Sequence, residues 1–194
     1  EALYQQNVLS VMEEVWHKEG ERIDLVIFLN GIAIFTFELK CNTSGQNYED
    51  AIRQYKFERD YKNRLLKFKA GCLAHFAMDL NEVYMCTHLK GRSSFFLPFN
   101  KGCGVGIHSG KGNPHNENGI NVSYMWEDIL KRDTVLYLID KIIFLQKETK
   151  KDPDTGKRVT KETLIFPRYH QFNAVRKLVA DVAEHHREKN YLIE

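Results

Sequence analysis

Two runs of apolar residues joined by Asn30-Gly31 dominate the hydrophobic pattern of this chain, over residues 22–40. Asn-Gly between two β-type runs predicts a tight hairpin. Isoleucine, valine, leucine and phenylalanine fill both faces of the predicted strands, so the sheet that they join should be covered on both sides. Asp24 and Glu38 lie near the open end of this hairpin. A carboxylate in such a strand is unfavourable unless it is paired or binds a metal, so both residues are candidates for function.

Further segments alternate between the strand and helix patterns. Residues 8–16 predict a first strand, and residues 71–78 and 82–89 predict another pair of strands. Residues 47–66 predict a helix that begins at Asn47, a good capping residue with a carboxylate three positions later. Its apolar stripe consists of Tyr48, Ala51, Ile52 and Tyr55. Strands and helices in one chain of this length indicate an α/β (α+β) fold.

The C-terminal part of the chain carries a different pattern. Residues 124–148 show helical periodicity with a break where Asp133 can cap a second helix. Residues 147–163 are strongly charged and contain an Asp-Pro-Asp-Thr-Gly turn, so we expect a linker or an exposed hairpin. A last amphipathic helix follows. The predicted division is a domain over 1–149, a charged linker or hairpin over 150–164, and a separate helix over 165–194.

The side chains of the first hairpin can be placed by parity, because residues alternate between the faces of a strand. A two-residue turn puts Glu38 on the face opposite to Asp24. A three-residue loop over 29–31 with a G1 bulge places Asp24 opposite Thr36, so that Thr36, Glu38 and Lys40 share its face. We therefore predict this odd loop or an equivalent bulge.

Two carboxylates and an amine on one face suit a metal-dependent phosphodiesterase site. Mg²⁺ prefers oxygen ligands and keeps several waters, so Asp24, Glu38 and the backbone carbonyl of Leu39 would suit it. Such a metal polarises a phosphate and acidifies a bound water, and Lys40 could offset developing negative charge. The ordinary alternative is a salt bridge at the end of the strand between Glu38 and Arg22, which the same loop would place opposite each other.

Composition limits the remaining possibilities. The chain has 194 residues and a net charge of +2, too small to argue for nucleic-acid binding, so any DNA-binding face must be local. There is no apolar run long enough to cross a bilayer and no signal peptide, which predicts a cytoplasmic location without membrane association. The chain begins with Glu rather than Met, which suggests a fragment. His75 and His88 fall in predicted strands, where we expect core or edge histidines rather than ligands. Four cysteines without Cys-x-x-Cys spacing predict reduced structural thiols: Cys41, Cys72, Cys86 and Cys103.

Several motifs, in this order, resemble the N-terminal part of the restriction (R) subunit of type I restriction-modification enzymes, a branch of the PD-(D/E)XK nuclease superfamily. They are DLVIFLNGIAIFTFELK (24–40), AIRQYKFERDY (51–61), LAHFAMDLNEVYMCTHL (73–89), FFLPFNKG (95–102), GNP (112–114) and IFPRYHQFNAVRKLV (165–179). The resemblance implies a restriction-endonuclease-like fold, with a mixed central sheet flanked by helices. It also implies Mg²⁺-dependent cleavage of double-stranded DNA.

The resemblance also implies roles for particular residues. The acid, acid and lysine of the superfamily motif map onto Asp24, Glu38 and Lys40, and a glutamine on the following helix maps onto Gln54. The family pattern has a tyrosine four residues after this glutamine, where this chain has Glu58. Tyrosines stand instead at positions 55 and 61, so the role of the family tyrosine has no assigned residue here.

In the family, the nuclease domain precedes a superfamily-2 motor that translocates DNA with ATP, together with modification and specificity subunits. Residues 165–194 would be the first helix of that motor, and Gln171 a candidate contact to the adenine of ATP in the full protein. For Gln171 the alternative is helix capping. For the whole chain the alternative is a non-catalytic module that binds DNA or docks onto its partners with a retained nuclease fold.

Overall fold

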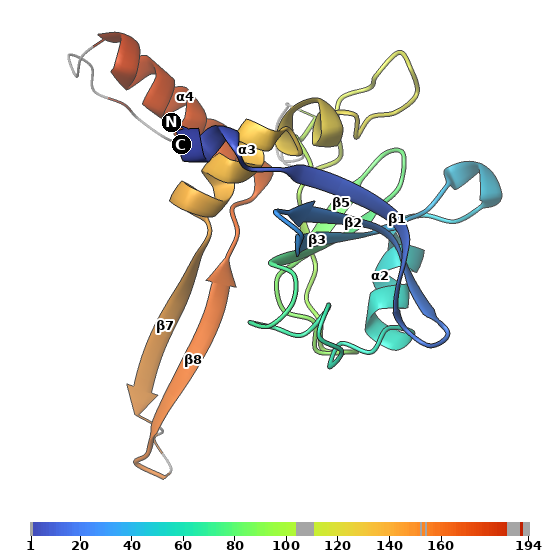
Figure 1. The fold of residues 1–194 in the computed structure, drawn as a ribbon, viewed down its shortest axis with the longest axis vertical. Coiled ribbons are helices and arrows are strands. Elements are labelled where there is room, and N and C mark those ends of the chain that lie inside the picture. The colour runs from blue at the N-terminus through green and yellow to red at the C-terminus, as the bar shows by residue number, and fades with distance from the viewer. Residues whose placement is uncertain (1, 104–110, 152, 154, 186–190, 192–194) are drawn as a thin grey trace.

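The central element of the fold is a six-stranded sheet (Figure 1). The computed structural model describes residues 2–103, 111–151, 153, 155–185 and 191. The strands lie in the order of the sequence, and β3 pairs with β4 in parallel while the other pairs are antiparallel. The six strands are β1 (Leu9–Lys18), β2 (Glu21–Leu29), β3 (Ile32–Leu39), β4 (Ala74–Met78), β5 (Val83–Cys86) and β6 (Leu97–Pro98). This confirms the predicted α/β class with a mixed central sheet.

Helix α2 (Tyr48–Phe57) begins as predicted and ends early. The side chain of Asn47 accepts hydrogen bonds from backbone N–H groups of the first turn, and the Asp50 carboxylate accepts one from the N–H of Asn47, which forms a capping box. The prediction extended this helix to residue 66. It stops nine residues earlier because the chain turns back over the strands, where the N–H of Asp60 donates to Glu21 at 2.8 Å.

The hairpin between β2 and β3 turns over two residues, so the predicted three-residue loop is wrong. Asn30 (φ 51°) and Gly31 (φ 79°) both adopt left-handed conformations, which suits a two-residue hairpin turn. The alternative form of the prediction, an equivalent bulge, is right, because the register shifts between Ile27 and Phe28. Beyond the bulge, Val26 pairs with Thr36 and Leu25 with Phe37. The predicted pairing of Asp24 with Thr36 is therefore wrong, and the same register leads from Leu25 and Phe37 to Asp24 and Glu38.

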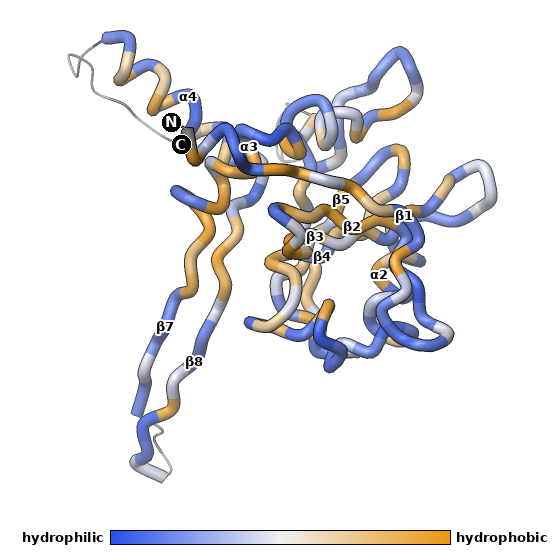
Figure 2. The backbone as a smooth tube through the Cα atoms, viewed as in Figure 1, coloured by the Kyte–Doolittle hydropathy of each residue, from blue (hydrophilic) through white to orange (hydrophobic). Residues whose placement is uncertain are grey.

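The sheet is buried on both faces, as predicted from its apolar strands. Phe35 and Phe37 of β3 belong to an aromatic-rich cluster on one face. On the other face, α2 packs through Tyr55, whose hydroxyl group bonds to Thr36. Thr36 and Glu38 therefore face α2, opposite to Phe35 and Phe37, and the parity prediction for these residues is confirmed. Figure 2 shows the apolar strands at the centre of this body.

Residues after the sheet form short helical turns and then a long hairpin. The helical turns are η3 (Met125–Ile129), α3 (Arg132–Tyr137) and η4 (Leu138–Ile142), with η3 and η4 wound as π-helix. The hairpin of β7 (Phe144–Lys151) and β8 (Arg158–Ile165) extends away from the body (Figure 1). The predicted helix over 124–148 is thus wrong from Phe144 onward, because these residues pair with β8. Asp133 is not a cap either, since it accepts a hydrogen bond from the Tyr4 hydroxyl group at 2.8 Å.

The remaining elements are α1 (Ala2–Gln5), η1 (Asn42–Ser44) and the long helix α4 (Tyr169–His185). The start of α4 packs on the aromatic face of the sheet, because Phe166 and Phe172 are buried in the same cluster as Phe35 and Phe76. The assignment of residues 165–194 to a motor domain stays a prediction. No helix in the part of the chain that the structure describes is long and apolar enough to cross a membrane.

Candidate functional site

Asp24 is held against the end of β3. Its Oδ2 atom accepts a hydrogen bond from the backbone N–H of Leu39 at 2.8 Å, which fixes the carboxylate next to Glu38. The side chain is only half-buried, so it remains accessible from outside. Leu39 was predicted to offer its carbonyl oxygen to a metal. The observed contact uses its N–H instead, and the carbonyl contact stays a prediction.

Glu38 is the most unusual group of the site. It has 0% exposure, yet only one of its oxygens is satisfied: Oε1 accepts a hydrogen bond from Nε of Arg59 at 2.7 Å. Oε2 is buried without a hydrogen-bond partner. Burial raises the pKa of Glu38 from 4.5 to about 7, while Arg59 opposes this and the neighbouring Asp24 adds to it. Buried polar atoms in folded proteins nearly always have a hydrogen-bond partner, so an unsatisfied carboxylate oxygen calls for an explanation, such as a bound ion.

Lys40 and Gln54 meet at the same end of the sheet. The Nζ atom of Lys40 donates to Oε1 of Gln54 at 2.5 Å. The backbone N–H of Lys40 donates to the carbonyl of Met78, so the lysine is anchored to β4. Gln54 is positioned by the capped helix α2. Of the four predicted site residues, Lys40 and Gln54 are thus in direct contact, while Asp24 binds the backbone of Leu39, next to Glu38 in the chain.

These groups fit a hard divalent cation. Oε2 of Glu38 has no partner, and the negative charge of Asp24 is near enough to raise the pKa of Glu38. Oxygen is the donor that Mg²⁺ prefers. The residues that the structure describes contain no group of three or more His, Cys, Asp or Glu side chains that could hold a metal. A set of two carboxylates completed by waters and backbone oxygens suits Mg²⁺ better than Zn²⁺, which is usually held by three or four protein ligands.

The base that pairs with Glu38 is not the one expected from the sequence. Arg22 was the predicted alternative partner, but it pairs with Glu14 at 3.1 Å. Sequence reasoning missed Arg59. One signal was available, because Arg59 follows Tyr55 by four residues and so continues the apolar stripe of the helix onto the face that packs on the sheet.

A buried polar chain lies behind the site. The hydroxyl groups of Tyr55 and Thr36 are 2.8 Å apart, and the Thr36 hydroxyl lies 2.8 Å from Nδ1 of His75. Burial lowers the pKa of His75 to about 3 and raises that of Tyr55. His75 is therefore a satisfied core histidine, as predicted, and Tyr55 is a packing residue. Tyr61 is partly buried and packs against the hydrophobic cluster that contains Tyr55.

Gln171 makes a helix-capping contact, which was the predicted alternative to contact with adenine. Its Oε1 atom accepts a hydrogen bond from the backbone N–H of Arg168 at 2.9 Å, at the start of α4. This is a capping contact. Contact with adenine stays a prediction.

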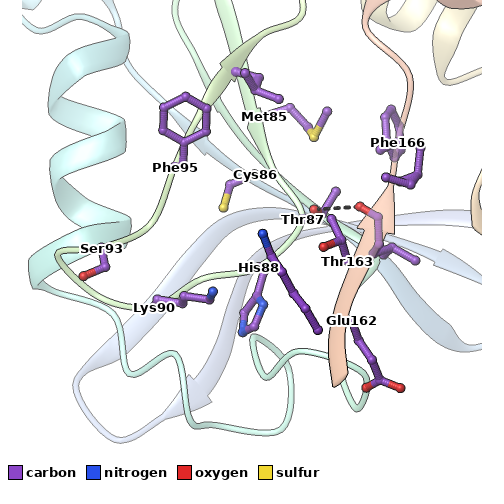
Figure 3. A pocket seen from close by; sticks show the side chains of 14 residues that line it. Met85, Cys86, Thr87, His88, Lys90, Ser93, Phe95, Glu162, Thr163 and Phe166 are labelled. Atoms are coloured by element: carbon purple, nitrogen blue, oxygen red, sulfur yellow. Dashed lines mark hydrogen bonds between the residues drawn. The ribbon is translucent and has the colours of Figure 1, made fainter. Parts of the chain in front are cut away.

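A cavity of about 380 Å³ opens elsewhere, between the end of β5 and strand β8 (Figure 3). Cys86, His88 and Lys90 line one side of it and Glu162 and Phe166 the other. None of the predicted site residues lines this cavity. It lies at the opposite end of the sheet from Asp24, because Cys86 pairs with the first half of β4 whereas the site is at its last residues.

Comparison with known proteins agrees with the resemblance seen in the sequence. Residues 3–94 match the family described as type I restriction enzyme R protein N terminus. This segment belongs to that family. A curated relative, the putative type I restriction enzyme MjaVIIIP endonuclease subunit of Methanocaldococcus jannaschii, is 26% identical over 200 residues. The match covers 96% of this chain but only 16% of the relative. No solved structure matches the chain.

The family segment contains Asp24, Glu38, Lys40 and Gln54, together with Arg59. Gln171 lies outside it, in the part that only the archaeal relative matches. The family match covers a little under half of the chain, and both matches support a role related to nuclease function.

Proposed function

We propose that this chain is a Mg²⁺-dependent endonuclease domain that cuts double-stranded DNA within a type I restriction enzyme. The observation that carries the proposal is the pair of carboxylates: Glu38 is buried with one oxygen unsatisfied, and Asp24 is fixed beside it. A structural salt bridge would not leave that oxygen without a partner. The family match over residues 3–94 supports the same function.

Each residue of the site has a distinct task in this proposal. Asp24 and Glu38 would hold the metal with the Leu39 carbonyl, and Mg²⁺ when bound would polarise the scissile phosphate and acidify a water. The ammonium of Lys40 would stabilise negative charge that develops on the phosphate. Gln54 accepts a hydrogen bond from Lys40 and would keep the ammonium pointing into the site.

The chain would work as part of a larger assembly. The M. jannaschii relative is about six times longer than the matched segment, which leaves room for a motor beyond the nuclease. In the full protein the partners would be double-stranded DNA, the C-terminal motor domains, and modification and specificity subunits. The motor would use ATP, with Gln171 near its adenine, and the enzyme would act in the cytoplasm.

The test uses the full-length R protein in its complete complex. Replacing Lys40 by Ala should abolish cleavage while DNA-dependent ATP hydrolysis and translocation persist, because the motor is separate from this site. Lys67→Ala removes an exposed lysine from the loop near the start of β3, away from Lys40, and should cut normally. Undiminished cleavage by the Lys40→Ala complex would instead favour the alternative, a docking module without catalysis.

A further inference from the structure

The two oxygens of Glu38 lie in different environments. Oε1 receives the charge-assisted hydrogen bond from Arg59, and Oε2 has no partner. We propose that Arg59 is a positioning residue for the metal site: it fixes Oε1 of Glu38 and thereby presents Oε2 to the divalent cation. This inference rests on the proposed function, because it requires that Glu38 is a metal ligand.

Arg59 is itself held from both sides along the chain. The N–H of Glu58 donates to the carbonyl of Gln54 at 2.9 Å, which ends helix α2. The N–H of Asp60 donates to Oε2 of Glu21 at 2.8 Å, which ties the next residue to the start of β2. The backbone of Arg59 thus runs between two fixed points.

The side chain of Arg59 has little freedom within this frame. It is 9% exposed and points from the turn after α2 into the sheet. A carboxylate is planar, so a short hydrogen bond to one oxygen also restricts the direction of the other. The partner group that orients a metal ligand commonly affects metal affinity as strongly as part of the ligand set does.

A second interpretation makes the opposite prediction. Arg59 could act as a clamp that competes with the metal for Glu38 and must leave before the metal binds. The contact geometry favours positioning, because a single nitrogen, Nε, binds a single oxygen and the second oxygen is left over. A clamp with a bidentate guanidinium would occupy both oxygens.

Mn²⁺ binding to the intact 194-residue chain separates the two interpretations. Free Mn²⁺ is followed by electron paramagnetic resonance, and folding of each variant is checked by circular dichroism. Arg59→Met keeps the aliphatic stem and removes the guanidinium, and should weaken Mn²⁺ binding about 10- to 100-fold. Arg53→Met is the matched control, because Arg53 is an exposed arginine beside Gln54 on the outer side of α2. It should bind Mn²⁺ like the unaltered chain.

Arg59→Lys decides the matter if Arg59→Met does not fold. It keeps the positive charge but lacks the guanidinium that reaches Oε1, so it should still weaken Mn²⁺ binding, about tenfold. Unchanged or tighter binding by either folded variant overturns the positioning role. Asp24→Asn tests the proposed function separately: if it binds Mn²⁺ as well as the unaltered chain, the metal site itself is wrong.

Discussion

Two glutamates of this chain each pair with basic side chains, and they behave in opposite ways. Glu38 is fully buried in the sheet and has one partner, Arg59. Glu162, on the projecting β7–β8 hairpin, receives Lys69 on one oxygen and Lys147 on the other, at 3.1 Å for Lys147. The pKa of Glu38 is raised to about 7, whereas the two lysines lower that of Glu162.

The difference shows that exposure to solvent, rather than the charge of the partner, determines the direction in which the pKa of a paired carboxylate shifts. At Glu162 both oxygens are satisfied and water remains close, so the pair is an ordinary surface interaction. At Glu38 the loss of water outweighs the stabilisation by Arg59, and one oxygen is left unsatisfied. The first arrangement links a hairpin to the body, and the second leaves one carboxylate oxygen for the proposed cation.

The largest expected contrast is in DNA cleavage. In the full-length complex, Glu38→Gln should lower the cleavage rate about a thousandfold, because a bound metal supplies several kcal/mol of transition-state stabilisation. Glu162→Gln makes the same chemical change on the hairpin and should cut at the normal rate. A plasmid-cleavage time course measures both. Equal rates for the two variants would mean that Glu38 is structural.

The second largest contrast is in stability, because the Glu38–Arg59 and Glu162–Lys69 pairs should contribute differently to the free energy of unfolding. Arg59→Met leaves a buried carboxylate without its counter-ion and should lower the free energy of unfolding by about 3 kcal/mol. Lys69→Met breaks an exposed pair and should give no measurable change. Urea denaturation followed by circular dichroism provides both values. A similar loss for Lys69→Met would show that the surface pair is not screened by solvent.

The effect of burial on charge should also appear at His75, behind the site. The ordinary histidine pKa is 6.5, and burial lowers it to about 3 in the folded chain. As the pH falls, His75 is therefore protonated in the unfolded chain before it is protonated in the folded chain. The stability that the neutral His75 contributes is complete above pH 6.5 and is lost as the pH falls toward 3. Between pH 7 and pH 5 the contribution of His75 should fall by roughly 2 kcal/mol. Glu38 acts in the opposite direction, because its raised pKa lets the folded chain take up a proton over the same range.

Replacement of this histidine provides the control. Urea denaturation of both proteins at pH 7 and pH 5 isolates the contribution of His75. The change in stability from pH 7 to pH 5 should be more favourable in His75→Gln than in the unaltered chain by roughly 2 kcal/mol, even if its stability at pH 7 is lower. The same change in both proteins would mean that His75 makes no such contribution.

The smallest expected effect concerns the hairpin. Lys69→Met removes one contact between β8 and the body, while the Thr87 hydroxyl still donates to the carbonyl of Leu164 at 3.0 Å. Hydrogen exchange of the β8 amides should become faster by about fivefold or less. Exchange over residues 32–40 should not change, and a change there would mean that the hairpin supports the site.

Local patterns accounted for the strands and for the start of the helix. The capping box at Asn47 was predictable because both its partners lie within four residues. The end of α2 was not, because the turn after Phe57 depends on contacts with Glu21, far away in the sequence. Strand β7 was assigned to a helix for a similar reason: its partner strand, and not its own periodicity, determines its conformation.

The β2–β3 hairpin shows both what local sequence predicted and what it could not predict. For Asp24 and Glu38 to share a face, the hairpin had to contain one residue more than a two-residue turn gives. The sequence could not choose between a longer loop and a bulge within the strand. Asn30 favoured the two-residue turn, because its backbone and side chain bind Val8 of the neighbouring chain segment. The bulge follows the second residue pair after the turn and supplies the extra residue that brings Asp24 and Glu38 to the same face.

By itself, the sequence determined that Glu38 and Lys40 belong to one face of a buried strand, because strand alternation follows from backbone geometry within a few residues. Only the tertiary structure decided that a bulge brings Asp24 to the same face, that Arg59 pairs with Glu38 and that Oε2 is left without a partner. The physical reason is that desolvation and hydrogen-bond satisfaction depend on every segment that packs around a group. In this chain those segments are separated by many residues and meet only when the turn after α2 folds over the sheet.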